Sequence, residues 1–139
     1  MDMKPRTLVP LLALAATLAC PTRPVFEGDR LPPGAWGGEH ALLVVSDTAA
    51  RLEFDCAAGR INIPLPVDSD GRFAWDGEYA VGHGGPIRQD EVPDVRPATY
   101  FGETNGRVMV LHVRVKDGSI PELAFTLERG RDGRVFKCL

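Results

Sequence analysis

Apolar and polar residues alternate along most of the chain after Trp36, and this alternation constrains the fold more than any other feature. In the segment 51–56, for example, Leu52, Phe54 and Cys56 alternate with charged residues. Side chains of a β-strand point to opposite faces in turn, so a period of two indicates strands with one buried and one solvated face. The chain offers no convincing helical period. The sequence therefore predicts an all-β domain.

Tight turns separate the alternating segments, and Asn105-Gly106 is the strongest turn signal because both central positions of such a hairpin need φ > 0. Consecutive strands joined by tight turns favour an antiparallel meander. A meander with one apolar face can close into a small barrel, which removes its edges; a two-sheet β-sandwich is the alternative. The expected strands, about eight in number, cover 40–46, 51–56, 60–63, 72–79, 96–104, 107–116, 123–127 and 134–138.

The first residues have the composition of an export signal. Lys4 and Arg6 precede an apolar run from Leu8 to Leu18, which is too short for a transmembrane anchor and typical of a cleavable signal peptide. We expect residues 1–19 to be this signal peptide and the protein to act outside the cytoplasm. The Pro-rich residues 20–35 are then expected to form a flexible tether, and residues 36–139 the domain.

The end of this leader, Ala16-Thr17-Leu18-Ala19-Cys20, resembles the lipobox of bacterial lipoproteins, although Thr17 stands where that motif most often has Leu. The resemblance implies cleavage before Cys20 and acylation of this cysteine, so that the protein is anchored in the cell envelope with the membrane as its partner. Ordinary cleavage after Ala19, which leaves a free thiol, is the alternative.

Charge and cysteine content narrow the class of protein further. The chain of 139 residues has a net charge of −3, and the part after the leader has −4 because residues 1–19 contribute +1. This balance argues against a nucleic-acid partner, which requires a concentrated basic surface. Outside the cytoplasm, Cys56 and Cys138 are expected to form a disulfide. The closed loop would be long, so the expected stabilisation is about 4–5 kcal/mol.

The alternation places most aromatic side chains on the inward faces of the expected strands. They could line a small apolar pocket or fill the interior of the barrel completely. Residues 80–94 are the longest stretch without regular structure, and we expect them to cap such a pocket. The candidate ligand-binding residues are Trp36, Phe54, Phe73, Trp75, Tyr79, His83, Tyr100 and Phe125.

The tripeptide Gly34-Ala35-Trp36, just before the first expected strand, resembles the G-x-W motif of lipocalin-like (calycin) barrels. The resemblance implies a Trp that closes the barrel floor near an Arg of a late strand, for which Arg129, Arg131 and Arg134 are candidates. The second motif of that family, a Thr-Asp-Tyr-like segment, is not evident. The resemblance thus concerns architecture and says little about a ligand.

Catalytic and metal motifs are not recognisable in the sequence. His40, His83 and His112 lack metal-ligand spacing, and we expect His40 and His112 to point away from the core. His83-Gly84-Gly85 has no accompanying nucleophile elbow. We therefore expect no cofactor, no metal and no enzymatic activity. The expected function is an envelope lipoprotein that binds a small apolar ligand inside its barrel. The alternative is a solid-core structural or inhibitor-like protein that acts through its surface or through residues 80–94, with an unknown protein partner.

Overall fold

The computed structural model of the protein describes Cys20 and residues 26–139. The expected signal peptide and residues 21–25 lie outside the described part. Among the described residues, no helix is long and apolar enough to cross a membrane. The eight strands are β1 (Gly34–Gly38), β2 (Ala41–Val45), β3 (Ala50–Phe54), β4 (Ala57–Ile61), β5 (Arg72–Val81), β6 (Asp94–Thr104), β7 (Val108–Val115) and β8 (Leu123–Arg129).

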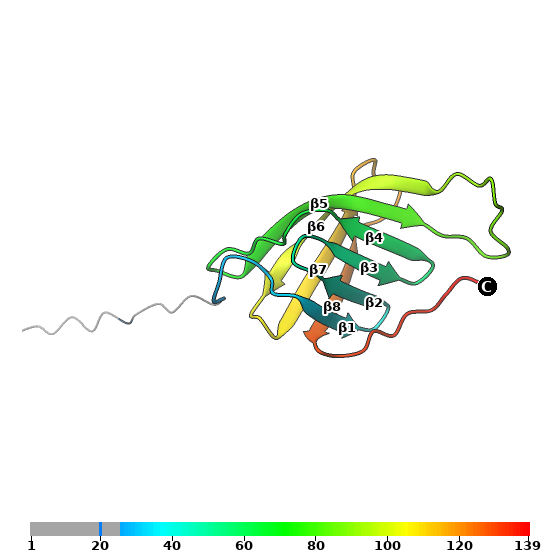
Figure 1. Ribbon diagram of the computed structural model, residues 1–139. Helices are drawn as coiled ribbons and strands as arrows, with labels where there is room; N and C mark the ends of the chain where they lie inside the picture. Colours follow the sequence, from blue (N-terminus) through cyan, green and yellow to red (C-terminus); the bar gives the residue numbers. More distant parts are fainter. Residues whose placement is uncertain (1–19, 21–25) are drawn as a thin grey trace, which may run out of the picture.

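Each strand pairs antiparallel with the next along the chain, and β1 also pairs antiparallel with β8, so the sheet closes into a barrel (Figure 1). The structure confirms the predicted all-β antiparallel meander, and the meander forms a closed barrel, not the alternative two-sheet sandwich. Closure matters physically because a closed sheet leaves no strand with unpaired backbone groups. The same register brings β1 and β8, which are distant in sequence, side by side.

The barrel interior is a single apolar core. Along β3 and β5 the burial alternates residue by residue, as the sequence pattern predicts. The largest side chains with essentially no solvent exposure come from strands all around the barrel and from the segment before β5: Trp36, Trp75, Tyr100, Leu43, Leu52, Ile61, Leu65, Met109, Leu111, Leu127 and Val113.

One end of the barrel, which we call the capped end, is covered by the segments 26–33 and 62–71. Phe26, Leu31, Leu65 and Val67 are buried there. The two segments hold each other through backbone hydrogen bonds, including one from the Leu31 amide to the Leu65 carbonyl at 2.8 Å. Residues 26–33 therefore differ from the flexible tether that the sequence suggested for 20–35: Phe26 and Leu31 supply apolar surface that the open barrel end would otherwise expose to water.

The opposite end, which we call the loop end, carries the connections 39–40, 55–56, 82–93 and 116–122. Figure 1 places it far from the blue segment that begins at residue 26. Two strand assignments from the sequence were wrong. Residues 34–38 form β1, and residues 134–138 form no strand but a tail with a single bridge, between Glu39 and Arg134. Phe136, expected to point inward, is 62% exposed.

Candidate functional site

The candidate ligand-binding residues separate into two groups. Trp36, Phe54, Phe73, Trp75, Tyr79 and Tyr100 are buried in the barrel interior, and Phe125 packs partly buried against them. His83 lies outside, exposed in the loop that follows β5. The interior rings contact one another: the Phe73 and Trp75 rings stack with centroids 4.0 Å apart, and Phe54 contacts Tyr79 and Phe125 at 5.6 and 5.1 Å.

The buried polar atoms of these aromatic residues are mostly satisfied from within. Tyr100 donates its hydroxyl proton to the Glu78 carbonyl at 2.7 Å, and the Trp75 indole N–H donates to the Pro66 carbonyl at 2.9 Å. Burial raises the pKa of Tyr79 and of Tyr100 above the ordinary value of a phenol, so both hydroxyls stay protonated at neutral pH. The Trp36 Nε1 atom is the exception: it is buried and finds no acceptor among the described residues.

The loop end is built on two tight hairpins with unusual backbone geometry. In each, two residues connect directly paired strand ends, Gly38 to Ala41 and Phe54 to Ala57. The second residue of each turn has a positive φ although it is not glycine, with 67° at His40 and 53° at Cys56. Such a conformation costs roughly 1–2 kcal/mol for a residue with a Cβ atom, and strained positions of this kind often cluster at functional sites.

The two strained turns are joined by a side-chain pair and by the C-terminal tail. Nδ1 of His40 donates to Oδ2 of Asp55 at 2.5 Å. The other oxygen of Asp55 accepts the Phe136 amide at 2.8 Å, and the Cys56 amide donates to the Phe136 carbonyl at 3.2 Å. Asp55 therefore fixes the His40 ring and the tail together.

The tail reaches this place by crossing the outside of β1. A Cβ atom at Gly37 would collide with the backbone of Arg131 and Asp132, so only glycine lets the tail lie this close. Cys138 then forms the predicted disulfide with Cys56, their Cα atoms 4.8 Å apart. This confirms the pairing, and the exposed Cys20 remains as the free cysteine of the described part.

The loop 82–93 next to the tail is closed on itself through His83. Its Nδ1 donates to the Gly84 carbonyl at 2.8 Å, and its Nε2 pairs with the Glu91 carboxylate, whose second oxygen accepts the Arg88 amide at 3.2 Å. Since both ring nitrogens face acceptors, the arrangement favours the protonated imidazole. The Gly84 carbonyl and then Glu91 accordingly raise the pKa of His83. We call this arrangement the His83 clasp.

Large apolar side chains are exposed on the loop and on the tail. Ile87 and Val92 are 82% and 86% exposed, and Phe136 is also open to solvent. Loop and tail are neighbours, because a Cβ atom at Gly84 would collide with the Leu139 carbonyl. Exposed apolar groups that gather at one place often mark a contact surface. The sequence indicated the loop by its length, but no sequence signal placed the tail beside it.

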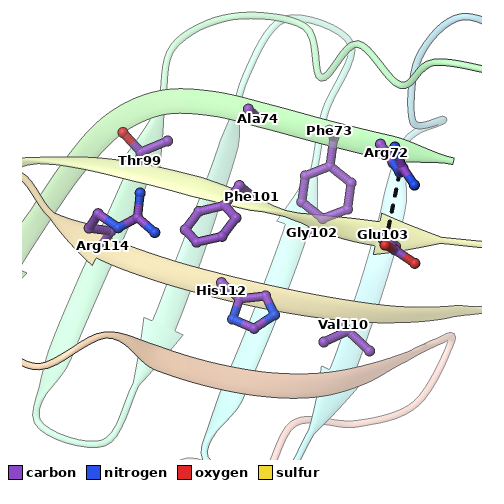
Figure 2. A pocket seen from close by; sticks show the side chains of 10 residues that line it. All are labelled: Arg72, Phe73, Ala74, Thr99, Phe101, Gly102, Glu103, Val110, His112 and Arg114. Atoms are coloured by element: carbon purple, nitrogen blue, oxygen red, sulfur yellow. Dashed lines mark ion pairs between the residues drawn. The ribbon is translucent and has the colours of Figure 1, made fainter.

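A hollow of about 700 Å³ lies on the outer face of β5, β6 and β7 (Figure 2). The Phe101 ring forms part of its floor, with the His112 ring stacked on it at 5.1 Å and the Arg114 guanidinium 4.7 Å from its centroid. Arg114 is also hydrogen-bonded to Glu122, and His112 lies 3.4 Å from the same carboxylate. The charged groups of this hollow are therefore largely occupied with one another.

Neither place has the layout of a known catalytic centre. His40 contacts Asp55 and the Phe136 ring, and neither provides a hydroxyl or thiol nucleophile. Within the part of the chain that the structure describes, no three His, Cys, Asp or Glu side chains are grouped so that they could hold a metal ion.

The molecule thus belongs to the class of small, closed antiparallel β-barrels, with one end capped and the other formed by a loop and a stapled tail. Trp36 pairs in register with Arg129 of β8, one of the three arginines considered from the sequence. No family model, curated protein or solved structure matches this chain.

Proposed function

We propose that this chain is an exported, lipid-anchored envelope protein whose barrel is a solid scaffold and whose loop end binds a protein partner. One observation carries the proposal: the interior aromatics pack on each other, while Ile87 and Val92 border one hollow at the loop end and Phe136 is exposed on the tail at the same end. An isolated soluble domain gains nothing from apolar side chains held in water, whereas a partner surface can bury them.

The anchor and the loop end lie at opposite ends of the barrel, which supports this arrangement. Acylation at Cys20 would place the membrane on the side of the capped end, since the chain joins the barrel there at Phe26. The span from Cys20 to Phe26 is at most about 20 Å even when fully extended. The loop end would therefore point away from the bilayer, toward other components of the envelope.

A catalytic role is not part of the proposal, nor is a nucleic-acid partner. The net charge of −3 opposes the binding of nucleic acid. His40 and Asp55, a hydrogen-bonded pair of the loop end, are engaged in holding the tail, since Asp55 also accepts the Phe136 amide. Their arrangement favours a structural task over proton transfer to a substrate.

A small apolar ligand inside the barrel is the second candidate function. It is favoured by the buried Trp36 Nε1, which lacks an acceptor and could donate to a bound molecule. Against it, the best-formed surface hollows among the described residues are lined by residues other than Trp75, Tyr79 and Tyr100, and of the interior aromatics only Phe73 borders one of them. Native mass spectrometry of the purified protein separates the two: a stoichiometric bound molecule would favour the ligand, and the bare protein mass favours the solid scaffold.

The partner surface is tested by photo-crosslinking in the producing cells. A photoreactive amino acid at Ile87 or Val92 is expected to give a discrete adduct with one protein, and the same group at Val108 of β7 serves as the exposed control. Equal labelling at all three positions would overturn the proposed partner surface. The anchor is tested separately by the mass of the N-terminal peptide, which should carry acyl chains on Cys20.

A further inference from the structure

Two arginines lie directly opposite each other on the outer face of the barrel. Arg51 of β3 and Arg60 of β4 are register partners, and both are exposed. The Cβ atoms of such cross-strand partners are about 4.5–5.5 Å apart, and like charges in this position are destabilising. Most other pairs of residues at these two positions would therefore be more stable than this pair of positive charges.

Neither arginine is held in an ion pair with a carboxylate. Among the described residues, the ion pairs within 4.0 Å leave out both Arg51 and Arg60. Glu53 and Glu78 lie on the same outer face, Glu78 as the register partner of Arg60 on β5, yet neither forms an ion pair with the arginines. In the hollow of Figure 2, by contrast, Arg72 pairs with Glu103 at 4.0 Å.

The two arginines border a hollow of about 450 Å³ that contains no acidic residue. Its other lining residues are Val44, Ser46, Asn62 and two alanines. The Ser46 hydroxyl donates to the Ala49 carbonyl at 3.0 Å, so it is engaged in the turn. The Asn62 side chain makes no hydrogen bond among those that the structure describes, so its amide group is available. The hollow therefore gathers guanidinium and amide donors around an acid-free space.

We propose that this hollow binds a phosphate-type oxyanion, held by Arg51 and Arg60 with Asn62 as a further donor. A guanidinium presents parallel N–H groups that match two oxygens of a phosphate, and two guanidinium groups together neutralise its charge. The bound anion would also relieve the repulsion between the two arginines. Glu53 and Glu78, which lie in the adjoining hollow, would keep the anion on the side of Ser46 and Asn62.

The place of this hollow suggests two sources for the phosphate. Arg51 is near the start of β3 and Arg60 near the end of β4, so both lie next to the capped end, where the chain arrives from Cys20. The phosphate could belong to a lipid headgroup of the anchoring membrane or to a small soluble molecule. Only the lipid source depends on the proposed anchor; the oxyanion site itself does not depend on the proposed partner surface at the loop end.

The test uses the exported protein with Cys20→Ser, so that no acyl chain contributes to binding. Inorganic phosphate is titrated at constant ionic strength with chloride as the balancing anion, and the arginine Nε–H and backbone amide signals are followed by NMR. Saturable shifts are expected at Arg51, Arg60 and Asn62. Arg51→Gln or Arg60→Gln should weaken phosphate binding at least about tenfold, since each change removes a guanidinium that forms charge-assisted hydrogen bonds with the anion.

Two variants make the result specific. Arg88→Gln removes the same charge from the exposed loop 82–93 and should change the phosphate affinity less than about twofold. Arg51→Lys keeps the charge without the planar fork and should bind more weakly than the parent. Equal effects of Arg51→Gln and Arg88→Gln, or the absence of saturable shifts, would overturn the site.

Vesicles then distinguish the sources. Binding to phosphatidylglycerol vesicles, but not to phosphatidylcholine vesicles, that is lost with Arg51→Gln assigns the site to lipid headgroups. Saturable binding of inorganic phosphate without vesicle binding assigns it to a soluble phosphate compound. Both results support the oxyanion site, and neither involves the loop end, so failure of the partner surface would not affect them.

Discussion

Gly59 of β4 lies directly against the Tyr100 side chain in the barrel interior. A Cβ atom there would collide with the Tyr100 hydroxyl and lie 3.1 Å from Cζ of the same ring. Gly59→Ala should therefore lower the free energy of unfolding by about 1–3 kcal/mol through overpacking. The measurement is urea denaturation followed by tryptophan fluorescence.

The Tyr100→Phe variant provides the internal control for this contact. Alone it removes the hydrogen bond to the Glu78 carbonyl and should cost about 1 kcal/mol. Combined with Gly59→Ala it removes the colliding oxygen, so the double variant should be more stable than the sum of the single effects predicts. Strict additivity of the two changes would show that Gly59 and Tyr100 do not contact each other in solution.

Cys56 combines a covalent bond with a strained backbone, and the two effects can be separated. Its φ of 53° suits glycine, not a residue with a Cβ atom. In a background with Cys138→Ala, we expect Cys56→Gly to be more stable than Cys56→Ala by about 0.5–1 kcal/mol. Glycine is normally less stable than alanine at a given position, because it loses more conformational entropy on folding. Thermal unfolding of the two double variants measures the difference, and a more stable alanine variant would contradict the strained turn.

At the scale of elements, the His83 clasp makes the order of the loop 82–93 depend on pH. The folded pKa of His83 lies above its ordinary value of about 6.5. A raised folded pKa means that the clasp stabilises the loop fully below about pH 6.5 and that this contribution disappears as pH rises through the folded pKa. Amide hydrogen exchange of residues 82–93, corrected for intrinsic rates, should therefore show less protection in alkaline than in mildly acidic solution.

Two histidine variants check this pH dependence. His83→Gln removes the titrating group and should abolish the difference in protection between the two pH values. His112→Gln changes a histidine on the outer face of β7 and should leave the loop unaffected. If the pH dependence of the loop survives His83→Gln, the clasp is not its cause.

The strands illustrate what the sequence could predict. Segments such as β3 and β5 were predictable because each alternates large apolar and charged residues. β1 has only Trp36 as a large side chain, because Gly37 must admit the tail and a Cβ at Gly38 would collide with the Thr126 carbonyl, so no alternation remains. The tail alternates like a strand but finds no free edge, since β1 is already paired on both sides.

The candidate sites were only partly predictable for a related reason. The length of the stretch 80–94 without regular structure indicated the loop, which the structure bounds at 82–93, and cysteine content indicated the disulfide. The contact of His40 with Asp55 and the opposition of Arg51 and Arg60 depend on register across strands. Register is set by turn lengths and by the hydrophobic pattern of all the strands together, so a local reading of one segment does not reveal it.

At the scale of the whole molecule, the two barrel ends differ in how they are closed. The capped end is covered by apolar side chains such as Leu31 and Leu65, whereas the loop end is held by polar and covalent links around Asp55 and Cys56. The stabilisation that apolar burial gives does not depend on pH or redox conditions, whereas the polar and covalent links of the loop end depend on both. A change in pH or in redox conditions should therefore destabilise the loop end first, and this end is also the proposed partner surface.

The disulfide allows a direct test of this difference. It connects residues 82 positions apart, so its removal should increase the conformational entropy of the unfolded chain. The free energy of unfolding should therefore fall by about 4–5 kcal/mol. Cys138→Ala achieves this without touching the strained turn at Cys56, and the same loss is expected on treating the parent protein with a reductant. Differential scanning calorimetry should show a lower melting temperature in both cases.

Hydrogen exchange locates the effect of that reduction within the fold. The amides of His40 and Cys56, which donate to the tail, should lose protection, because the tail then keeps its noncovalent contacts but loses its covalent link to the barrel. The Leu31 amide at the capped end should keep its protection relative to the global stability. A uniform loss at both ends would mean that the barrel unfolds as one unit and that the loop end has no independent stability.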